Sequence, residues 1–363
     1  MGGLLQYFQD HPLALPLFLV MFTAIIAVHE FGHYLTARLL GMRVLEFAFG
    51  FPPRLFAVRR GGIDYSVNAL PFGGFVRILG QDDFSIEQRG AGEPGSFTSK
   101  PWWAQAIVLA SGVVMNFILA IAVLTIAFAA GTPTPTGQIR VDRVAPGSPA
   151  AVAGIQPGDI VRSIDGQPVT KTGDLVNYVR VHADREVTLE LERNGRPITI
   201  RAMPRAQPPE GEGPLGIVLG EVTTNEPVPL PQAFVQAVGL AGDVVQQIAE
   251  LPGQLLNRAP GTQGPPPVGG PIEIFRVTAA ASEFGLPTFL KLVGVISVNL
   301  GVLNIIPFPG LDGGRLFFVL LGAVLRRRIS PQVEAAIHAV GFVLLLGLLV
   351  IVSVADIRRA TGG

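Results

Sequence analysis

The amino-acid sequence predicts an α-helical polytopic membrane protein with four transmembrane helices, an inserted water-soluble α/β domain and a membrane-associated β-hairpin. Only 15% of its 363 residues are charged, whereas soluble globular proteins carry about 25%. The mean hydropathy is +0.47. Charged side chains are nearly absent from four runs, and a run of about 20 apolar residues is long enough to span a bilayer.

The four runs define the expected spans. The first extends from His11 to Ala37 and contains one formally charged side chain, Glu30. The others cover residues 101–139, 292–311 and 335–355. A cleaved signal peptide is the alternative for the first run, but residues 1–10 contain no Lys or Arg and the apolar stretch is too long. We therefore expect four retained spans.

Composition excludes several classes of protein. Basic and acidic residues balance at 27 each, which argues against a nucleic-acid partner. Because there is no cysteine, any metal must be held by nitrogen and oxygen ligands. The arginines at 326–328 lie between spans three and four and place that loop in the cytoplasm. Both termini and the segment between spans two and three are then extracytoplasmic.

That segment has a soluble character. It contains 22 charged residues between Arg140 and Glu226. Its patterns predict strands at 139–144, 160–164, 187–192 and 197–201, a helix near 174–181, and a hairpin turn at Asn194-Gly195. A further helix at 231–256 has apolar residues at helical spacing, as an interfacial helix does.

The segment after span one predicts a β-hairpin. Alternating residues at 54–58 and 63–70 flank a turn at 59–62, and 71–76 continues as an apolar extended stretch. Unpaired strand edges cannot face lipid. The stretch must therefore pair with protein or with a strand supplied by a ligand.

Span one contains His29-Glu30-Phe31-Gly32-His33. Residues at i and i+4 share a helix face, so both imidazoles can bind one metal ion beside Glu30, the general base of an HExxH site. A chance match with a pore-facing glutamate is the alternative, but a carboxylate inside a membrane helix is costly without a function.

A third ligand is needed, and Asp312 at the end of span three lies at a similar depth. A helix N-cap is its alternative role. Before it, Pro307 and Pro309 break the helix and expose a substrate path. Asn304 either hydrogen-bonds the substrate or the oxyanion, or bonds a neighbouring helix.

The pairing of HExxH with Asn-x-x-Pro-x-Pro-x-Leu-Asp-Gly resembles the site-2 proteases, intramembrane zinc metalloproteases, and most closely the bacterial regulator-of-sigma-E type. The resemblance implies one Zn²⁺ per chain, held by His29, His33 and Asp312, with Glu30 as the catalytic base. It also implies a set of substrate-binding residues: Asn304, Pro307, Pro309, Gly73, Gly74, Phe75 and Asn116. Val113 replaces the family's proline near Asn116.

The inserted segment resembles a PDZ domain across residues 145–166. This resemblance implies a peptide groove at Leu215, Gly216 and Ile217, which would receive a peptide C-terminus. The domain either captures peptides or only acts as a steric shield.

We expect hydrolysis of peptide bonds in or near transmembrane segments, at the bacterial inner membrane. The resemblance implies a single-pass membrane substrate, already cleaved by another protease, such as an anti-sigma factor or a remnant signal peptide. A catalytically silent PDZ-bearing scaffold is the alternative. An ion transporter is disfavoured, because the sequence shows neither repeat symmetry nor charged residues along several spans. The sequence is expected to divide into seven segments. They are the first span (1–40), the cytoplasmic loop with the hairpin (41–100), the second span (101–136), the PDZ domain (137–225), a linker with an amphipathic helix (226–285), the third span (286–325), and the fourth span with the C-terminus (326–363).

Overall fold

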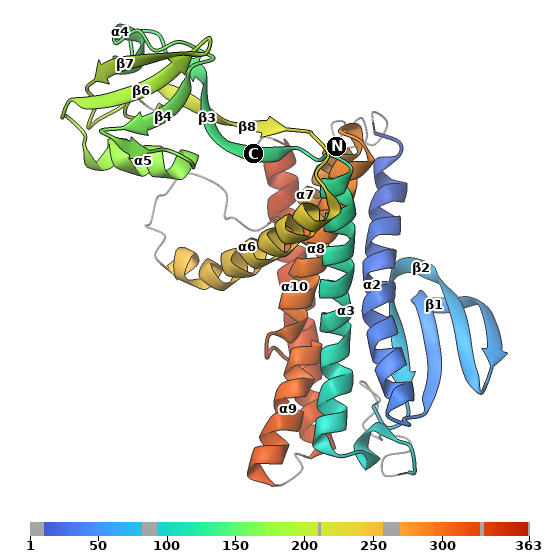
Figure 1. Cartoon of the computed structure of the whole chain (residues 1–363). Helices are drawn as coiled ribbons and strands as arrows, with labels where there is room; N and C mark the ends of the chain where they lie inside the picture. The colour runs from blue at the N-terminus through green and yellow to red at the C-terminus, as the bar shows by residue number, and fades with distance from the viewer. Residues whose placement is uncertain (1–10, 82–92, 210–211, 257–268, 327–329, 362–363) are drawn as a thin grey trace. The chain divides into compact units, whose positions relative to one another are not determined.

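The computed structural model describes residues 11–81, 93–209, 212–256, 269–326 and 330–361 (Figure 1). The chain divides into two compact units. One unit contains residues 1–130 and 228–363, and the other contains residues 131–227. We call the first the membrane unit and the second the inserted domain, and describe each by itself.

Among its described residues, the membrane unit contains four helices long and apolar enough to span a bilayer, which confirms the predicted number of spans. They are α2 (Ala14–Leu39), α3 (Trp102–Ala129), α8 (Leu286–Ile305) and α10 (Pro331–Thr361). The other helical elements of the unit are η1 (Phe97–Ser99), α6 (Leu230–Leu256), α7 (Pro271–Glu283) and α9 (Asp312–Leu325). The helix expected at 231–256 corresponds to α6, whereas the sequence patterns missed α7.

The third span differs from its expected extent of 292–311. Helix α8 begins earlier, at Leu286, and ends at Ile305. The chain then turns through two prolines, which lack the amide donors that a continuous helix needs. A separate helix, α9, begins at Asp312.

Helix α3 packs against α2, α6, α8 and α9. Two glycines permit the closest of these contacts. A Cβ atom at Gly32 would lie 2.5 Å from the Ser111 carbonyl oxygen, and one at Gly294 would lie 2.4 Å from Leu124. The backbones of α2 and α8 therefore approach α3 closely, as small residues allow in membrane helix packing.

The predicted hairpin consists of β1 (Val44–Arg60) and β2 (Ile63–Ile78). Residues 46–49 of β1 pair on one side with 74–77 and on the other side with 64–67. The end of β2 therefore forms an edge of this small sheet. Figure 1 shows the hairpin beside α2, and Thr23 Oγ1 donates to the Pro71 carbonyl at 3.0 Å.

A buried charge stabilises this arrangement. The carboxylate of Glu46 is only 3% exposed. It accepts a hydrogen bond from Ser66 Oγ at 2.8 Å and pairs with Arg77 at 3.0 Å and with Arg54. Several charge-assisted partners offset the desolvation of a buried carboxylate.

The inserted domain is an antiparallel sheet in the order β7-β6-β4-β3-β8, with β5 paired to β4. Its elements are β3 (Thr134–Val144), α4 (Pro149–Val152), β4 (Ile160–Ile164), β5 (Gln167–Pro168), α5 (Thr172–Val181), β6 (Val187–Arg193), β7 (Arg196–Ala202) and β8 (Ile217–Thr224). Asn194 and Gly195 both have positive φ, as a two-residue hairpin turn requires.

The core of this domain includes Ile139, Leu175, Leu189 and Leu215, each at most 1% exposed. The peptide contact expected at Leu215 is a backbone contact and stays a prediction. The Leu215 side chain belongs to the core, so only its backbone is available to a ligand. Strand β8 lies at the sheet edge and contacts α5.

Candidate metal centre

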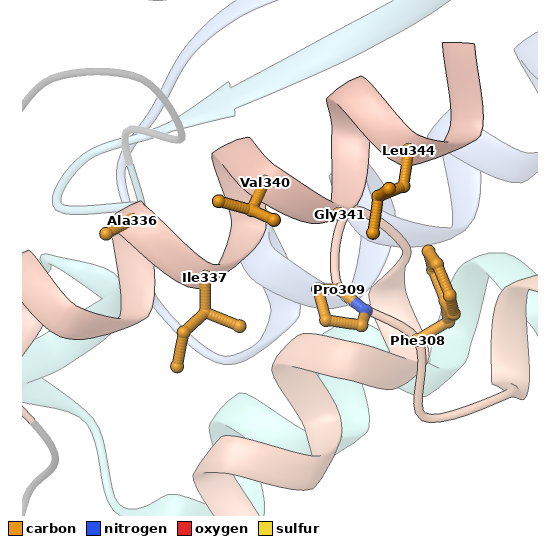
Figure 2. A pocket seen from close by; sticks show the side chains of 7 residues that line it. All are labelled: Phe308, Pro309, Ala336, Ile337, Val340, Gly341 and Leu344. Carbon is orange, nitrogen blue, oxygen red and sulfur yellow. The ribbon is translucent and has the colours of Figure 1, made fainter. Parts of the chain in front are cut away.

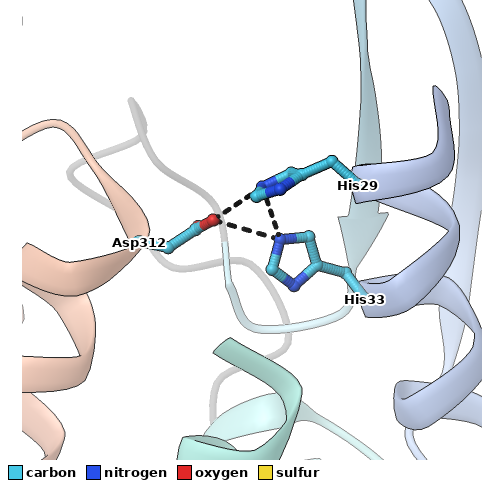
Figure 3. Close-up of side chains that lie close together, drawn as sticks. All are labelled: His29, His33 and Asp312. Carbon is cyan, nitrogen blue, oxygen red and sulfur yellow. Dashed lines mark hydrogen bonds and ion pairs between the residues drawn. The ribbon is translucent and has the colours of Figure 1, made fainter. Parts of the chain in front are cut away.

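His29 and His33 lie on adjacent turns of α2, and Asp312 is the first residue of α9 (Figure 3). The Oδ2 atom of Asp312 is 2.9 Å from His29 Nε2 and 3.1 Å from His33 Nε2. The two Nε2 atoms are 3.2 Å apart. Three ligand atoms from opposite ends of the chain therefore converge on one point.

The spacing of these atoms fits a single zinc ion. Ligands at about 2.0–2.2 Å from zinc lie roughly 3.3 Å from one another in a tetrahedron. The three observed separations, 2.9, 3.1 and 3.2 Å, are close to that value. Two imidazoles and one carboxylate leave a fourth position open, as in catalytic zinc sites.

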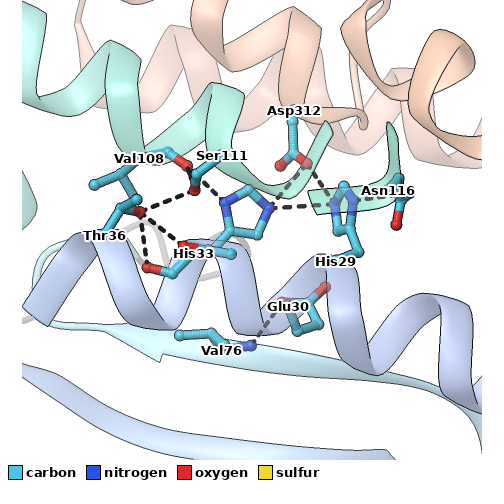
Figure 4. Close-up of polar contacts among 10 residues, drawn as sticks. His29, Glu30, His33, Thr36, Val76, Val108, Ser111, Asn116 and Asp312 are labelled. Atoms are coloured by element: carbon cyan, nitrogen blue, oxygen red, sulfur yellow. Dashed lines mark hydrogen bonds and ion pairs between the residues drawn. The ribbon is translucent and has the colours of Figure 1, made fainter. Parts of the chain in front are cut away.

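A backbone contact fixes the tautomer of His33. Its Nδ1 atom donates a hydrogen bond to the carbonyl oxygen of Val108 at 2.7 Å (Figure 4). When neutral, His33 therefore presents the lone pair of Nε2 to the other two ligands. Metal-binding histidines are commonly oriented by such a second hydrogen bond.

Asn116 is fully buried on α3, and its amide nitrogen lies 3.2 Å from His29 Nδ1. The amide oxygen has no hydrogen-bond partner among the described residues. A half-turn of the amide exchanges the two atoms. His29 then donates from Nδ1 to the amide oxygen, and its Nε2 lone pair faces His33 and Asp312. Sequence analysis expected a substrate contact for Asn116, whereas the structure places it against a histidine ring.

Gly112 makes room for both rings. A Cβ atom there would lie 2.5 Å from His33 Nε2 and 2.7 Å from His29 Nε2. Any larger residue would occupy the space where the imidazoles meet. Helix α3 thus supports the two imidazoles with a glycine, a backbone carbonyl and a side-chain amide.

Glu30 is next to His29 but directed to the hairpin. Its Oε2 atom accepts a hydrogen bond from the Val76 backbone N–H at 3.0 Å (Figure 4). Gly74 lies at the same edge, where a Cβ atom would be 3.8 Å from Glu30 Cγ and 2.6 Å from the Ala48 carbonyl oxygen. The structure therefore brings Gly74 and the Val76 N–H to the carboxylate, and Gly73 and Phe75 flank Gly74 along β2.

The remaining expected residues lie at the helix break. Asn304 is in the last turn of α8 and partly exposed, Pro307 is exposed, and Pro309 is partly buried. The loop that contains both prolines leads directly to Asp312.

The residues expected to bind a peptide lie in the inserted domain. Ile217 begins β8, and Gly216 precedes it with a φ of +71°.

Comparison with known proteins decides the family. The model of peptidase family M50 matches residues 17–348. This chain belongs to peptidase family M50. The resemblance to site-2 proteases is confirmed, and this M50 peptidase is a hydrolase of the metalloprotease type that contains several membrane helices.

Relatives match this M50 peptidase over nearly its full length. A protein of Clostridium perfringens named as a zinc metalloprotease is 34% identical, over 93% of this chain and 97% of that protein. A second such protein, from Rhizobium meliloti, is 33% identical over 96% of this chain and 97% of that protein. The zinc metalloprotease RasP of Oceanobacillus iheyensis is 27% identical over 94% and 98%.

A solved structure, the PDZ domain of an SdrC-like protein from Listeria monocytogenes, covers 24% of this M50 peptidase. The match covers 93% of that chain, at 19% identity and a TM-score of 0.22.

Sequence reasoning missed two supports of the centre. Val108 contributes a backbone oxygen, which leaves no signature in the sequence. Gly112 directly precedes Val113 in the sequence, and the need for a glycine becomes visible only when the two imidazoles are seen against α3.

Proposed function

We propose that this chain is an intramembrane zinc metalloprotease that hydrolyses peptide bonds in or near transmembrane segments of membrane proteins. The observation that carries the proposal is the convergence of His29, His33 and Asp312 within 4.8 Å of one another. These residues lie in or beside helices that are apolar and long enough to span a bilayer.

One zinc ion per chain is held by the two imidazole Nε2 atoms and the Asp312 carboxylate. When bound, zinc supplies a Lewis acid that activates water and polarises the scissile carbonyl. The zinc in the names of the relatives supports this choice of metal.

Glu30 acts as the general base. It removes a proton from the attacking water and returns it to the leaving amine. The Val76 N–H orients its carboxylate from the hairpin side. Asn116 orients His29, and Asn304, at the end of α8, donates a hydrogen bond to the developing oxyanion or to the substrate backbone.

The edge of β2 holds the substrate extended. A peptide bond inside a helix is protected by its own hydrogen bonds, so the substrate must unwind before cleavage. A strand laid against Gly73, Gly74 and Phe75 gains main-chain hydrogen bonds in exchange. Pro307 and Pro309, which keep the chain non-helical beside Asp312, form the opposite side of the path.

The inserted domain selects what reaches the centre. The edge of β8 at Gly216 and Ile217, next to α5, can receive a peptide C-terminus by strand addition. Its bulk also excludes substrates with large outer domains. The substrate is then a single-pass membrane protein already cleaved by another protease, such as an anti-sigma factor or a remnant signal peptide.

The bacterial relatives and the four candidate membrane helices support a location in the bacterial inner membrane. The positive-inside rule supports an orientation with the termini and the inserted domain extracytoplasmic. This orientation places the hairpin on the cytoplasmic side. Regulated intramembrane proteolysis is the process that such a protease serves.

The test compares purified wild-type protein, His29→Ala and Glu30→Gln. We expect one zinc per chain in the wild type and in Glu30→Gln, and loss of zinc in His29→Ala. Cleavage of a co-expressed single-pass membrane protein with a truncated outer domain is expected from the wild type alone. The catalytically silent scaffold would instead be indicated if the wild type contained no zinc and if peptide binding by the inserted domain survived His29→Ala. Unchanged product bands from Glu30→Gln would eliminate Glu30 as the base.

A further inference from the structure

Helix α10 contacts the loop that leads to Asp312, although it supplies no candidate ligand of its own. The backbone N–H of Gly310 donates a hydrogen bond to Nδ1 of His338 at 2.9 Å. The His338 side chain is only 8% exposed. Gly310 is two residues before Asp312, so this bond ties α10 to the chain immediately before the carboxylate.

A second contact lies one turn further along α10. A Cβ atom at Gly341 would lie 2.2 Å from the carbonyl oxygen of Pro309. The helix backbone therefore touches the loop backbone there, and Figure 2 shows Gly341 facing Pro309. Gly310 is also closely approached, because a Cβ on it would lie 3.2 Å from the Phe342 backbone nitrogen.

An open apolar groove lies beside these contacts. A pocket of about 330 Å³ lies between α10 and the loop, lined by Phe308, Pro309, Ala336, Ile337, Val340, Gly341 and Leu344 (Figure 2). Side chains in a filled interface would fix the loop by their shape. Here the hydrogen bond of His338 and the close approach of Gly341 fix it instead.

The loop transmits its position to Asp312. Cβ atoms at Gly313 and Gly314 would lie 2.3 Å and 2.4 Å from the carbonyl oxygens of Ile306 and Phe308. The turn is thus packed against the first residues of α9, the helix that begins at Asp312. In a well-formed site the metal–ligand distances lie within about 0.2 Å of their usual values.

We propose that His338 is a positioning residue that, together with Gly341, holds the Asp312 carboxylate at the metal centre through Gly310 and Pro309. The inference rests on the proposed zinc site. It assigns a function to a buried histidine outside that site, and it makes α10 a part of the zinc-binding architecture.

The chemistry of the hydrogen bond suggests a selective substitution. Because the Gly310 N–H donates, His338 must offer an acceptor at Nδ1. Asparagine places its amide oxygen close to that position, whereas leucine has similar bulk and no acceptor. His338→Leu is therefore expected to weaken zinc binding about tenfold or more, as loss of an outer hydrogen bond does at other metal sites. His338→Asn is expected to retain wild-type affinity to within about threefold.

The second contact offers a matched glycine pair on the same helix. Gly341→Ala places a methyl group against the Pro309 oxygen, whereas Gly347→Ala meets no atom within 4 Å. Gly341→Ala should weaken zinc binding and Gly347→Ala should not. Both substitutions favour helix formation equally, so a difference between them reports the loop contact.

Zinc affinity of the detergent-solubilised full-length protein is measured by competition with a chromophoric chelator, and the cobalt-substituted protein is examined by absorption spectroscopy. A changed cobalt spectrum in His338→Leu and Gly341→Ala, restored in His338→Asn, supports the proposal. Equal affinities and spectra in all four variants and the wild type overturn it. So does an equal loss in His338→Asn and His338→Leu, because the acceptor would then be irrelevant. If the wild type binds no zinc, the proposed metal centre fails as well.

Discussion

The backbone N–H of Val76 donates a hydrogen bond to the Glu30 carboxylate at 3.0 Å, which joins the edge of the hairpin to the proposed base. The register pairs Val76 with Phe47 on the other side of β2. The same backbone that would align a substrate strand therefore also orients the group that would activate water.

The substitution Val76→Pro tests whether the Val76 N–H orients the Glu30 carboxylate. Proline removes the N–H, and proline is tolerated at a strand edge where that N–H makes no ladder bond. We expect about a tenfold or greater loss of kcat from a misplaced base, at unchanged zinc content. Val76→Ala keeps the N–H and is the control. Cleavage assays with zinc analysis decide, and equal activity of the two variants would contradict the role of this bond.

Gly112→Ala should impair metal binding directly, because the new methyl group would lie within 2.7 Å of both imidazoles. We expect zinc affinity to fall about tenfold or more. The control is Gly239→Ala on α6, where nothing lies within 4 Å of the added methyl group. Chelator competition measures both, and retained affinity in Gly112→Ala would show that the rings can move aside.

Substitution of Asn116 distinguishes ring orientation from substrate contact. Asn116→Ala leaves His29 Nδ1 without a partner and should lower zinc affinity about 10- to 100-fold, whereas Asn116→Asp keeps an acceptor. If Asn116 instead contacts substrate, zinc affinity stays constant and KM rises. Parallel measurements of zinc affinity and KM on the same preparations give the answer.

Acid should destabilise the inserted domain through Asp159, whose side chain is 1% exposed. Burial alone raises the pKa of Asp159, but hydrogen bonds from Arg193 and from the Gln156 amide outweigh it and hold the pKa below its usual value. The stabilisation is therefore complete above about pH 4, the usual aspartate range, and is lost as the pH falls through the lower folded value.

Arg193→Ala should remove this contribution, at a cost of about 2–3 kcal/mol in unfolding free energy at neutral pH. Arg162→Ala breaks the more exposed pair with Glu192, whose side chains are 45% and 30% exposed, and should cost less than about 1 kcal/mol. Pulse proteolysis in urea measures both. Equal effects would show that the Asp159 pair has no special weight.

Local patterns predicted much of this architecture. Charge-free runs located the four spans, because a bilayer imposes length and composition on each helix separately. The HExxH spacing placed both imidazoles on one face of α2, since a helix fixes the relation between i and i+4. Asp312 followed from its depth in a broken span.

Other features depend on contacts between distant segments. The carbonyl of Val108 and the missing Cβ of Gly112 matter only because α2 packs against α3 at that level. The burial of the Leu215 side chain could not be predicted from a motif that concerns the backbone. Helix α7 was missed because its amphipathic pattern is short and follows a proline-rich segment. Burial and pairing partners of this kind are set by tertiary packing, which a linear pattern does not contain.

The first residues of β3 pair with the last residues of β8, with Thr134 opposite Thr224 and Pro135 opposite Thr223. The polypeptide thus leaves for the inserted domain and comes back at neighbouring points, about 5 Å apart for paired strands. Excision of the intervening stretch and its replacement by a few residues would span the gap without stretching the rest of the chain. A module joined in this way can be exchanged with little strain on the helices of the membrane unit.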